Sequence, residues 1–445
     1  MEVLIEKIIV YGIVLLLCAV TVYFYLRTLS KKSKETEKKV ATAKEEGLFE
    51  PVSLHPYIDL STCIGSAACV AACPEKDILG IVNGKATVIN STNCIGHGAC
   101  FHSCPVEAIT LRIGTEKRGV ELPHVNENFE TNINGIYIAG ELGGMGLIKN
   151  SVEQGEQAVE NIAKSKKPSK EGVLDVIIIG AGPAGISASL NAKRLGLSSI
   201  TLEQDSLGGT VFTFPRAKIV MTAPMNLPLH GKVKLYDTSK QVLLDLWKKV
   251  IDENDLQIKE FSKVESITPI ADGNFKIITS NDEEYIGRNV LIAIGRRGTP
   301  RKLNVPGEDL PKVAYRLIES ERINGKKVLV VGGGDSAVES ALLLKDNNEV
   351  ILSYRKEKFA RIKPKNRDKI LEASEDGSIK VMYNTNLVSI NMDNVLINHS
   401  ESGDTQMVEN DLVFIFAGGE MPTKFLNSAG VEIKKRFGHV MKKHS

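Results

Sequence analysis

The stretch from residue 174 to 190, LDVIIIGAGPAGISASL, decides how most of this 445-residue chain is built. An uninterrupted apolar run from Leu174 to Ile179 predicts a buried strand of a parallel sheet. Gly180, Gly182 and Gly185 follow at G-x-G-x-x-G spacing and open an Ala- and Ser-rich helix. In this pattern the first glycine makes the tight turn, the second lets the backbone approach a pyrophosphate, and the third packs helix against strand. The stretch therefore predicts a dinucleotide-binding fold.

The next strand ends on an acidic residue. Residues 200–203 read ITLE, and Glu203 lies 18 positions after Gly185, where a carboxylate can accept a hydrogen bond from a ribose hydroxyl. The helix N-terminus, with Pro183 and Ala184 in its first turn, would face the phosphates. A Pro-Ala pair inside this glycine pattern is typical of flavoproteins that bind FAD. The expected FAD-binding residues are Gly180, Gly182, Pro183, Ala184, Gly185 and Glu203.

A second glycine-rich turn, GGGDSA at 332–337, follows the apolar run 327–331. Alanine is permitted at its last glycine position. The next strand, 350–353, leads into basic residues at 354–356, with Arg361 nearby. Basic side chains at this strand end suit the 2′-phosphate of NADP, and a solvated surface loop is the alternative. The expected NADPH-binding residues are Gly332, Gly334, Asp335, Ser336, Ala337, Arg355, Lys356 and Arg361.

Six of the seven cysteines form two copies of the pattern C-x5-C-x3-C-P, 31 residues apart. Bacterial two-cluster ferredoxins carry C-x2-C-x2-C-x3-C-P, and the last cysteine of each run ligates the other cluster. Ser66 and His97 stand where the second cysteine of each run is expected. The candidate metal ligands are Cys63, Cys69, Cys73, Cys94, Cys100, Cys104, Ser66 and His97.

Crossed ligation divides these ligands into two sets. One iron–sulfur cluster would take Cys63, Cys69 and Cys104 with Ser66 at its odd corner, and the other would take Cys94, Cys100 and Cys73 with His97. Each cluster is expected to be 4Fe-4S or 3Fe-4S. Ser66 either leaves a three-iron cluster or ligates weakly, and His97 either ligates a fourth iron or is a hydrogen-bonded neighbour. Zinc is a lesser alternative. The motifs resemble those of ferredoxins that serve monooxygenases in actinobacteria.

The N-terminus carries one long apolar segment. Its 19 residues, 8–26, include no charged side chain, and at ~1.5 Å per residue such a helix spans the hydrocarbon of a bilayer. Basic residues follow from Arg27 onward, which favours a cytoplasmic location for the rest of the chain. A cleaved signal peptide is the alternative, but it would need a shorter apolar core. We expect a single-pass anchor in the inner (cytoplasmic) membrane, followed by a solvated charged spacer at 30–52.

Composition narrows the classes of function. Lys and Arg number 56 against 54 Asp and Glu, so the charge balance gives no reason to expect nucleic acid as a partner. Cysteines clustered at ligand spacing indicate metal binding in a reducing compartment, not a disulfide framework.

Residues 173–445 resemble the thioredoxin-reductase-like flavoproteins. The family's motifs occur in order, as GAGPAG (180–185), LIAIGRRGTP (291–300), GGGDSAVE (332–339) and VFIFAGGEMP (413–422). The basic stretch YRKEKFARIKP is most similar to the bacillithiol-disulfide-reductase branch. The resemblance implies FAD and NADP sites. No C-x-x-C follows residue 104, which excludes a thioredoxin-type dithiol relay.

The family's FAD-closing segment is due at the end of the chain but stands upstream. Residues 131–163 look like its strand, turn and helix, with Gly140 and Glu141 at the turn and Glu141 where the family has Asp. We interpret the flavoprotein as circularly permuted, with the ferredoxin-like module fused to the moved segment. An unrelated helical linker is the alternative. Permutation is plausible because the termini of domains usually lie close together.

The predicted fold class is α/β, with two Rossmann-type nucleotide-binding domains (FAD and NADP), a small α+β dicluster ferredoxin domain and one transmembrane helix. The predicted boundaries are 1–29 for the anchor, 30–52 for the charged linker, 53–113 for the ferredoxin-like domain, 114–165 for the FAD-closing segment, 166–299 for the FAD domain, 300–420 for the NADP domain and 421–445 for the return to the FAD domain.

The expected function is a membrane-anchored oxidoreductase that passes electrons from NADPH through FAD to the clusters, and on to an unidentified protein or small-molecule acceptor. The reverse direction, as in a ferredoxin–NADP reductase, is equally compatible with these motifs. A disulfide or low-molecular-weight thiol reductase that acts at the flavin is the alternative enzyme, and a redox sensor is the non-enzyme alternative. The sequence is also compatible with a homodimer.

Overall fold

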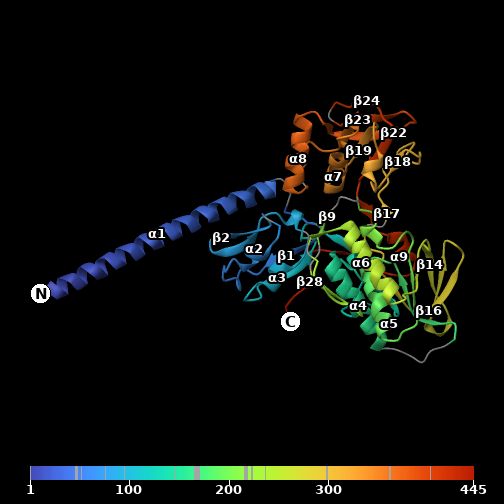
Figure 1. The fold of residues 1–445 in the computed structure, drawn as a ribbon, viewed down its shortest axis with the longest axis horizontal. Helices are drawn as coiled ribbons and strands as arrows, with labels where there is room; N and C mark the ends of the chain where they lie inside the picture. The colour runs from blue at the N-terminus through green and yellow to red at the C-terminus, as the bar shows by residue number, and fades with distance from the viewer. Residues whose placement is uncertain are drawn as a thin grey trace. The chain divides into compact units, whose positions relative to one another are not determined.

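The computed structural model describes residues 2–45, 49–51, 53–75, 77–94, 96–144, 146–164, 171–214, 219–221, 224–235, 237–296, 299–359, 362–400 and 402–444. Arg361, a predicted NADPH ligand, lies outside the described residues. The chain divides into two compact units (Figure 1). The first, Met1–Gly119 with Phe437–Ser445, holds the cysteine motifs; the second, Val120–Arg436, holds both glycine-rich turns.

The first unit begins with one long helix, α1 (Glu2–Glu45). By length and composition α1 could cross a membrane, a test that a signal sequence near the N-terminus also passes. The apolar side chains of its first half are exposed, as at Leu15, Leu17 and Phe24. Every side chain described between residues 9 and 30 is exposed. Packing inside the protein therefore does not explain why this segment is apolar.

The second half of α1 contacts the hairpin of β2 (Leu79–Val82) and β3 (Lys85–Val88). Ser33, Thr36, Val40 and Ala43 are its half-buried or buried positions, and their spacing of three and four residues places them on one helix face. The amide of Asn83 donates to Ser33 Oγ at 2.9 Å. Residues 33–43 therefore pack against the hairpin, whereas we expected a solvated spacer. Their small side chains allow the helix to approach closely, although the sequence here shows no apolar stripe that would predict packing.

A three-stranded antiparallel sheet, in the order β1-β4-β28, forms the rest of the first unit's framework. Its strands are β1 (Leu54–Ile58), β4 (Ile109–Ile113) and β28 (His439–Lys442). The short helices α2 (Ala68–Ala72) and α3 (Ala99–His102) each carry the middle cysteine of a motif.

Strands β2 and β3 form a separate hairpin, and β4 pairs with β1 and β28. We assigned residues 421–445 to the FAD domain, whereas residues from Phe437 onward belong to the first unit. Strand β28 extends the edge of β4, where it supplies backbone partners that an exposed edge would lack.

The second unit contains a seven-stranded sheet in the order β13-β8-β7-β16-β15-β14, with β6 also paired to β16. The strands are β6 (Ile136–Ile138), β7 (Leu174–Ile179), β8 (Ser199–Leu202), β13 (Ile258–Lys259), β14 (Val264–Pro269), β15 (Phe275–Thr279) and β16 (Glu284–Ile292). Pairing among β13, β8, β7, β16 and β6 is parallel. Residues 176–179 are almost fully buried, as a strand covered on both faces requires.

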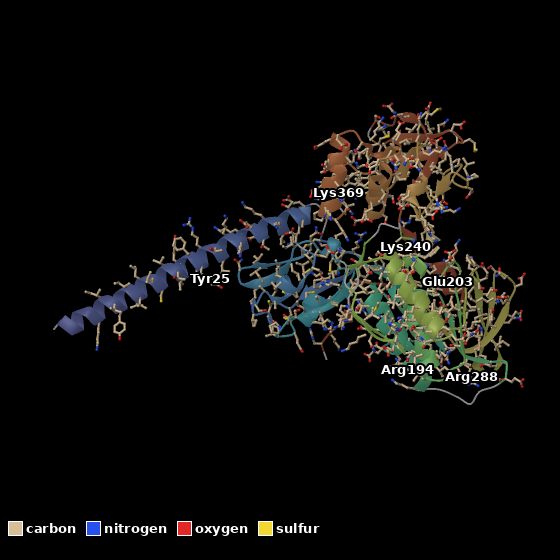
Figure 2. All side chains as sticks on the ribbon, in the orientation of Figure 1. Tyr25, Arg194, Glu203, Lys240, Arg288 and Lys369 are labelled. Carbon is tan, nitrogen blue, oxygen red and sulfur yellow. The ribbon has the colours of Figure 1, made fainter. Side chains whose placement is uncertain are left out.

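The upstream segment supplies an edge strand and a helix to this sheet. Strand β6 pairs with the end of β16, with Ile136 opposite Val290. Helix α4 (Ile148–Lys164) packs along α5 (Pro183–Arg194). Arg194 of α5, labelled in Figure 2, pairs with Glu156 and Glu160 of α4, each at 3.1 Å. Residues 136–164 thus belong to the same core as the first glycine-rich turn.

A second parallel sheet, in the order β18-β25-β19-β20-β21, lies between residues 313 and 415. Its strands are β18 (Val313–Ala314), β19 (Lys327–Val331), β20 (Glu349–Tyr354), β21 (Ile379–Tyr383) and β25 (Leu412–Ile415), with helices α7 (Asp335–Leu344) and α8 (Pro364–Glu375). Strands β22 (Thr385–Ile390), β23 (Asn394–His399) and β24 (Thr405–Glu409) form an antiparallel meander. The chain enters and leaves this region through the ribbon of β17 (Thr299–Pro300) and β26 (Gly419–Glu420).

The remaining elements connect these sheets. Helix α6 (Lys240–Glu253) buries Trp247 in the core beside α5, and α9 (Thr423–Ser428) packs near β14. Strand β5 (Val120–Pro123) pairs with β27 (Ile433–Arg436). The protein as a whole is a mixed α/β chain with one mixed and one parallel sheet, and a glycine-rich turn follows one parallel strand of each, β7 and β19.

Candidate cofactor sites

The first glycine-rich turn is shaped by close backbone contacts. Gly180 has a φ of +103°, and a Cβ atom there would lie 2.7 Å from the carbonyl oxygen of Ala293. A Cβ atom on Gly185 would lie 1.8 Å from the carbonyl oxygen of Gly180. Gly182, in contrast, meets nothing within 4 Å and precedes Pro183 at the start of α5. The turn therefore excludes side chains on its inner side and leaves backbone open at the helix N-terminus, as a phosphate site requires.

Glu203 holds this turn in place. Its Oε2 accepts a hydrogen bond from the amide of Ala181 at 2.7 Å, and its Oε1 accepts one from Asp205 at 3.0 Å. The side chain is buried, and burial raises the pKa of its carboxyl group. Because a carboxylate has about four acceptor positions, these contacts leave capacity for a ribose hydroxyl.

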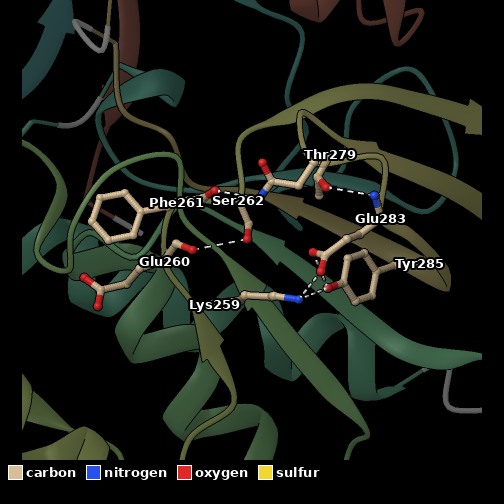
Figure 3. Close-up of polar contacts among 8 residues, drawn as sticks. Lys259, Glu260, Phe261, Ser262, Thr279, Glu283 and Tyr285 are labelled. Carbon is tan, nitrogen blue, oxygen red and sulfur yellow. Dashed lines mark hydrogen bonds and ion pairs between the residues drawn. The ribbon is translucent and has the colours of Figure 1, made fainter.

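The backbone of Glu203 is fixed by the loop that follows β13. Its amide donates to the carbonyl of Lys259 at 2.9 Å, and the amide of Ser262 donates to the carbonyl of Glu203 at 2.7 Å. Figure 3 shows the neighbouring contacts, in which the Lys259 ammonium group meets Glu283 and the Tyr285 hydroxyl. These contacts tie the loop to the hairpin of β15 and β16, so that the acidic strand end is rigid.

The upstream segment meets the same turn. Gly140 has a φ of +83°, and its amide donates to Gln154 Oε1 at 2.8 Å. A Cβ atom on Gly140 would lie 3.1 Å from Ala184 Cβ, and one on Gly155 would lie 2.1 Å from the Ala184 carbonyl oxygen. Glu141 follows at the start of a short 3-10 helix, Glu141–Gly143. The structure therefore brings Gly140 and Glu141 beside residues 180–185, although 40 positions separate Gly140 from Gly180 in the sequence.

The second glycine-rich turn has a similar form. A Cβ atom on Gly332 would lie 2.6 Å from the carbonyl oxygen of Phe416 and 3.1 Å from Ala337 Cβ. Gly334 has open space around it and precedes α7. Asp335 Oδ1 accepts hydrogen bonds from the amide of Lys363 at 2.9 Å and from Asn366 Nδ2 at 2.7 Å. Asp335 thus joins the turn to the start of α8.

The basic residues after β20 lie next to this turn. A Cβ atom on Gly333 would lie 1.9 Å from the ring of Tyr354, which stacks on Phe359 with ring centroids 5.0 Å apart. Arg355 and Lys356 follow Tyr354 and are exposed, as is Ser336 at the start of α7. The stacked rings fix where the strand ends, and the exposed residues Arg355 and Lys356 follow directly.

The first cysteine set surrounds a cavity. Cys63, Cys69, Cys104 and Ser66 are among its lining residues, and it is partly open to solvent. The amide of Ala86 points to Cys63 Sγ at 3.4 Å, and that of Ala108 points to Cys104 Sγ at 3.3 Å. Amide donors to sulfur are a feature of iron–sulfur sites. This is the set that crossed ligation predicts, and the residues fit a cluster.

The cysteines of the second set, Cys73, Cys94 and Cys100, also lie near one another. Burial raises the pKa of Cys94 to about 11, with Cys73 contributing. Burial likewise raises the pKa of Cys100 to about 12, and Cys94 and Cys73 contribute. His97 stands in the same loop, and burial lowers the pKa of its imidazole. Within the described residues, no three Cys, His, Asp or Glu side chains converge as a single metal ion requires.

Two contributors were missed in the sequence. Lys85 of β3 donates to the carbonyl of Cys63 at 2.5 Å, so the hairpin that meets α1 also supports the first cysteine set. His444 stacks on Phe101, the neighbour of Cys100, with centroids 3.7 Å apart. Neither could be found from the spacing of the motifs, because Lys85 lies between them and His444 is brought near by the pairing of β28 with β4.

Comparisons with known proteins agree with this geometry. Residues 177–444 match the family model described as pyridine nucleotide-disulphide oxidoreductase, and residues 55–105 match a 4Fe-4S dicluster domain. The chain is similar to bacilliredoxin reductase Bdr of Bacillus subtilis, at 28% identity over 59% of this chain and 82% of that protein. It is also similar to a ferredoxin–NADP reductase of Ignicoccus hospitalis, at 26% identity over 58% of this chain and 82% of the relative.

A solved structure shows the same likeness. The bacillithiol disulfide reductase Bdr (YpdA) of Staphylococcus aureus superposes with a TM-score of 0.52 at 26% identity, covering 58% of this chain and 80% of that one. The cysteine motifs and the helix α1 lie outside residues 177–444, the part that the reductase family model matches.

Proposed function

The chain belongs to the pyridine nucleotide-disulphide oxidoreductase family, and from this premise we propose that it oxidises NADPH at FAD and passes the electrons to two iron–sulfur clusters. It is an NAD(P)H-dependent flavoprotein oxidoreductase by its relatives. The observation that carries the electron route is the gathering of Cys63, Cys69 and Cys104, from two separate motifs, around one cavity. This crossed arrangement is that of two-cluster ferredoxins.

In this proposal the turn at 180–185 and the acid Glu203 hold FAD. The open backbone at Gly182 binds the pyrophosphate, and Glu203 binds the ribose while its remaining hydrogen bonds keep the turn rigid. Gly140 and Glu141 close the site from the upstream segment. When bound, FAD accepts two electrons from a nicotinamide and releases them one at a time, and iron–sulfur clusters carry single electrons.

NADPH would bind at residues 332–337 and at the end of β20. Gly334 leaves the start of α7 open for the pyrophosphate, and Arg355 and Lys356 are free to bind a 2′-phosphate. The short ribbon of β17 and β26 is the route by which the chain enters and leaves this region. A narrow connection of this kind lets the nicotinamide end and the flavin approach each other.

Helix α1 serves as a membrane anchor in this proposal, with the enzyme on the cytoplasmic side. Its length and composition support a span, and Arg27, Lys31 and Lys32 follow the apolar residues. The contacts of Ser33 with Asn83 and of Lys39 with Asp77 hold the cysteine-rich unit to the helix that leaves the membrane. Residues 27–43 rise by about 25 Å, so the clusters would serve an acceptor at or near the membrane.

The test is anaerobic titration of the full chain in detergent with NADPH, followed by optical and EPR spectra. We expect flavin bleaching and then iron–sulfur signals. Cys69→Ala should lose the signal of the first cluster and keep FAD, whereas Cys18→Ala, at the cysteine outside both motifs, should keep both. Flavin bleaching in protein that never gains an iron–sulfur signal would refute the electron route.

A second candidate is a disulfide or low-molecular-weight thiol reductase that acts at the flavin. The likeness to the two Bdr reductases favours it. It would show disulfide-dependent NADPH oxidation that survives in Cys69→Ala. The electron-transfer proposal expects acceptor reduction to fall with cluster loss, so one variant separates the two functions.

A further inference from the structure

One buried polar atom in the second cysteine motif has no hydrogen-bond partner. The Nε2 atom of His97 is enclosed, and no donor or acceptor contacts it among the described residues. A buried polar group left in this state destabilises the fold. Such an atom therefore indicates a site for a partner that binds nitrogen.

Other unpartnered atoms of this kind occur in the described residues, and they lie outside the two motif loops. They belong to His124, Trp247, Arg367, Asn398 and His444. His97 alone among them stands at the position where a two-cluster ferredoxin has a cysteine ligand. Its position in the sequence and the state of its nitrogen are independent observations that agree.

Ser66 occupies the same position in the first motif and differs in its surroundings. It is exposed, and its Oγ accepts a hydrogen bond from the amide of Ala68 at 3.5 Å. The backbone of the two loops is alike, because Ala67 and Gly98, the residues after Ser66 and His97, both have left-handed φ values, +59° and +76°. The contrast therefore lies in the side chains: one corner opens to solvent and the other is closed by an imidazole.

We propose that His97 Nε2 is the fourth protein ligand of the second cluster, completing a set with Cys73, Cys94 and Cys100, while the first cluster has no fourth protein ligand. The inference rests on the proposed presence of two clusters. Imidazole nitrogen is a good ligand for iron, and replacement of a thiolate by histidine raises the potential of a cluster. The two clusters are then unequal. The second has four irons and a higher potential than the same cluster with four cysteine ligands. The fourth corner of the first faces solvent.

The test is pulsed EPR on the full chain, purified in detergent, reduced with dithionite, and prepared with natural-abundance histidine or with histidine labelled by ¹⁵N in the ring. We expect a strong nitrogen coupling to the reduced second cluster that changes with the isotope. His97→Ala should remove this coupling and one iron atom per chain. His102→Gln, five residues away on α3 and exposed, is the matched control and should change neither.

A second variant keeps the test decisive if His97→Ala does not fold. His97→Cys restores the usual four-cysteine set, so iron content should stay as in the parent protein while the midpoint potential of one cluster falls. Ser66→Ala should leave iron content unchanged, because Ser66 holds no iron in this proposal.

The outcomes separate the inference from the function on which it rests. Protein that holds both clusters but shows no isotope-sensitive nitrogen coupling would overturn the ligand assignment and leave the electron route standing. Protein without iron under anaerobic purification would overturn both. An iron loss in Ser66→Ala equal to that in His97→Ala would contradict the proposed inequality of the two sites.

Discussion

Gly155 tests whether the upstream segment is built into the FAD site. It lies on α4 where that helix crosses α5, and a Cβ atom there would come within 2.1 Å of the Ala184 carbonyl oxygen and 2.9 Å of its carbonyl carbon. Carbon atoms of neighbouring groups usually stay at least about 3.5 Å apart. The neighbour is backbone, so Gly155→Ala obliges one helix to move by about 1 Å or more.

The magnitude follows from two opposing effects. Alanine in a helix interior gains about 1 kcal/mol over glycine. Overpacking in a closed core costs about 1–3 kcal/mol, and more where backbone must shift. Helix α4 also carries fully buried residues, among them Val152, Ala158 and Val159. A shift of the helix would weaken their packing against the core as well. We expect a net loss of about 1–2 kcal/mol, which lowers the melting temperature of a unit as large as Val120–Arg436 by about 1–3 °C.

The assay is thermal release of flavin fluorescence from the full chain, with FAD content measured after purification. Gly155→Ala should melt earlier and hold less FAD, because α4 follows directly from Gly140 and Glu141 in the site. Gln157→Ala, exposed on the same helix, is the control and should change stability by less than about 0.5 kcal/mol. A melting temperature that rises in Gly155→Ala, with full FAD content, would show that the two helices do not pack as described.

Three further predictions concern other parts of the chain. Arg355→Ala combined with Lys356→Ala should raise the KM for NADPH far more than the KM for NADH. Lys369→Ala, at an exposed position of α8, is the control and should leave both KM values unchanged. Equal effects on the two nucleotides would contradict 2′-phosphate recognition. Glu141→Ala should lower FAD occupancy in absorbance spectra, and full retention would count against its place in the site. Burial lowers the pKa of His55 below 6.5, so the unfolded chain binds this proton more tightly and the stability due to neutral His55 is lost as pH falls below about 6.5. In denaturant titrations, the free energy of unfolding should fall less between pH 7.5 and pH 5.5 in His55→Gln than in the parent protein. An identical fall in both would refute this.

Local patterns predicted the turns well because each turn is set by neighbours in sequence. The contacts of Gly185 with Gly180, and of Glu203 with Ala181, follow from the spacing of one strand, turn and helix. The crossed cysteine set was also predictable, since it follows from a rule about ligand order.

The rest depends on pairing between distant segments. Nothing in residues 33–43 indicates packing, because small side chains at helical spacing carry no apolar signal. The strand His439–Lys442 contains two polar residues of four and pairs with β4 through backbone groups, which any sequence offers equally. His97 shows the limit most clearly: the sequence left two roles open, and only the enclosure of Nε2 favours one of them.

The position of β28 has a consequence for how the protein is made. Cys104 leaves the ribosome 335 residues before His439, an interval of about 20–70 s at ordinary rates of translation. During that time the sheet beside the cysteines lacks its last strand, and the edge of β4 is uncovered. The cysteine-rich unit is therefore completed only after the reductase has been synthesised. A chain that terminates before His439 would lack β28 and leave the edge of β4 uncovered beside the cysteine motifs.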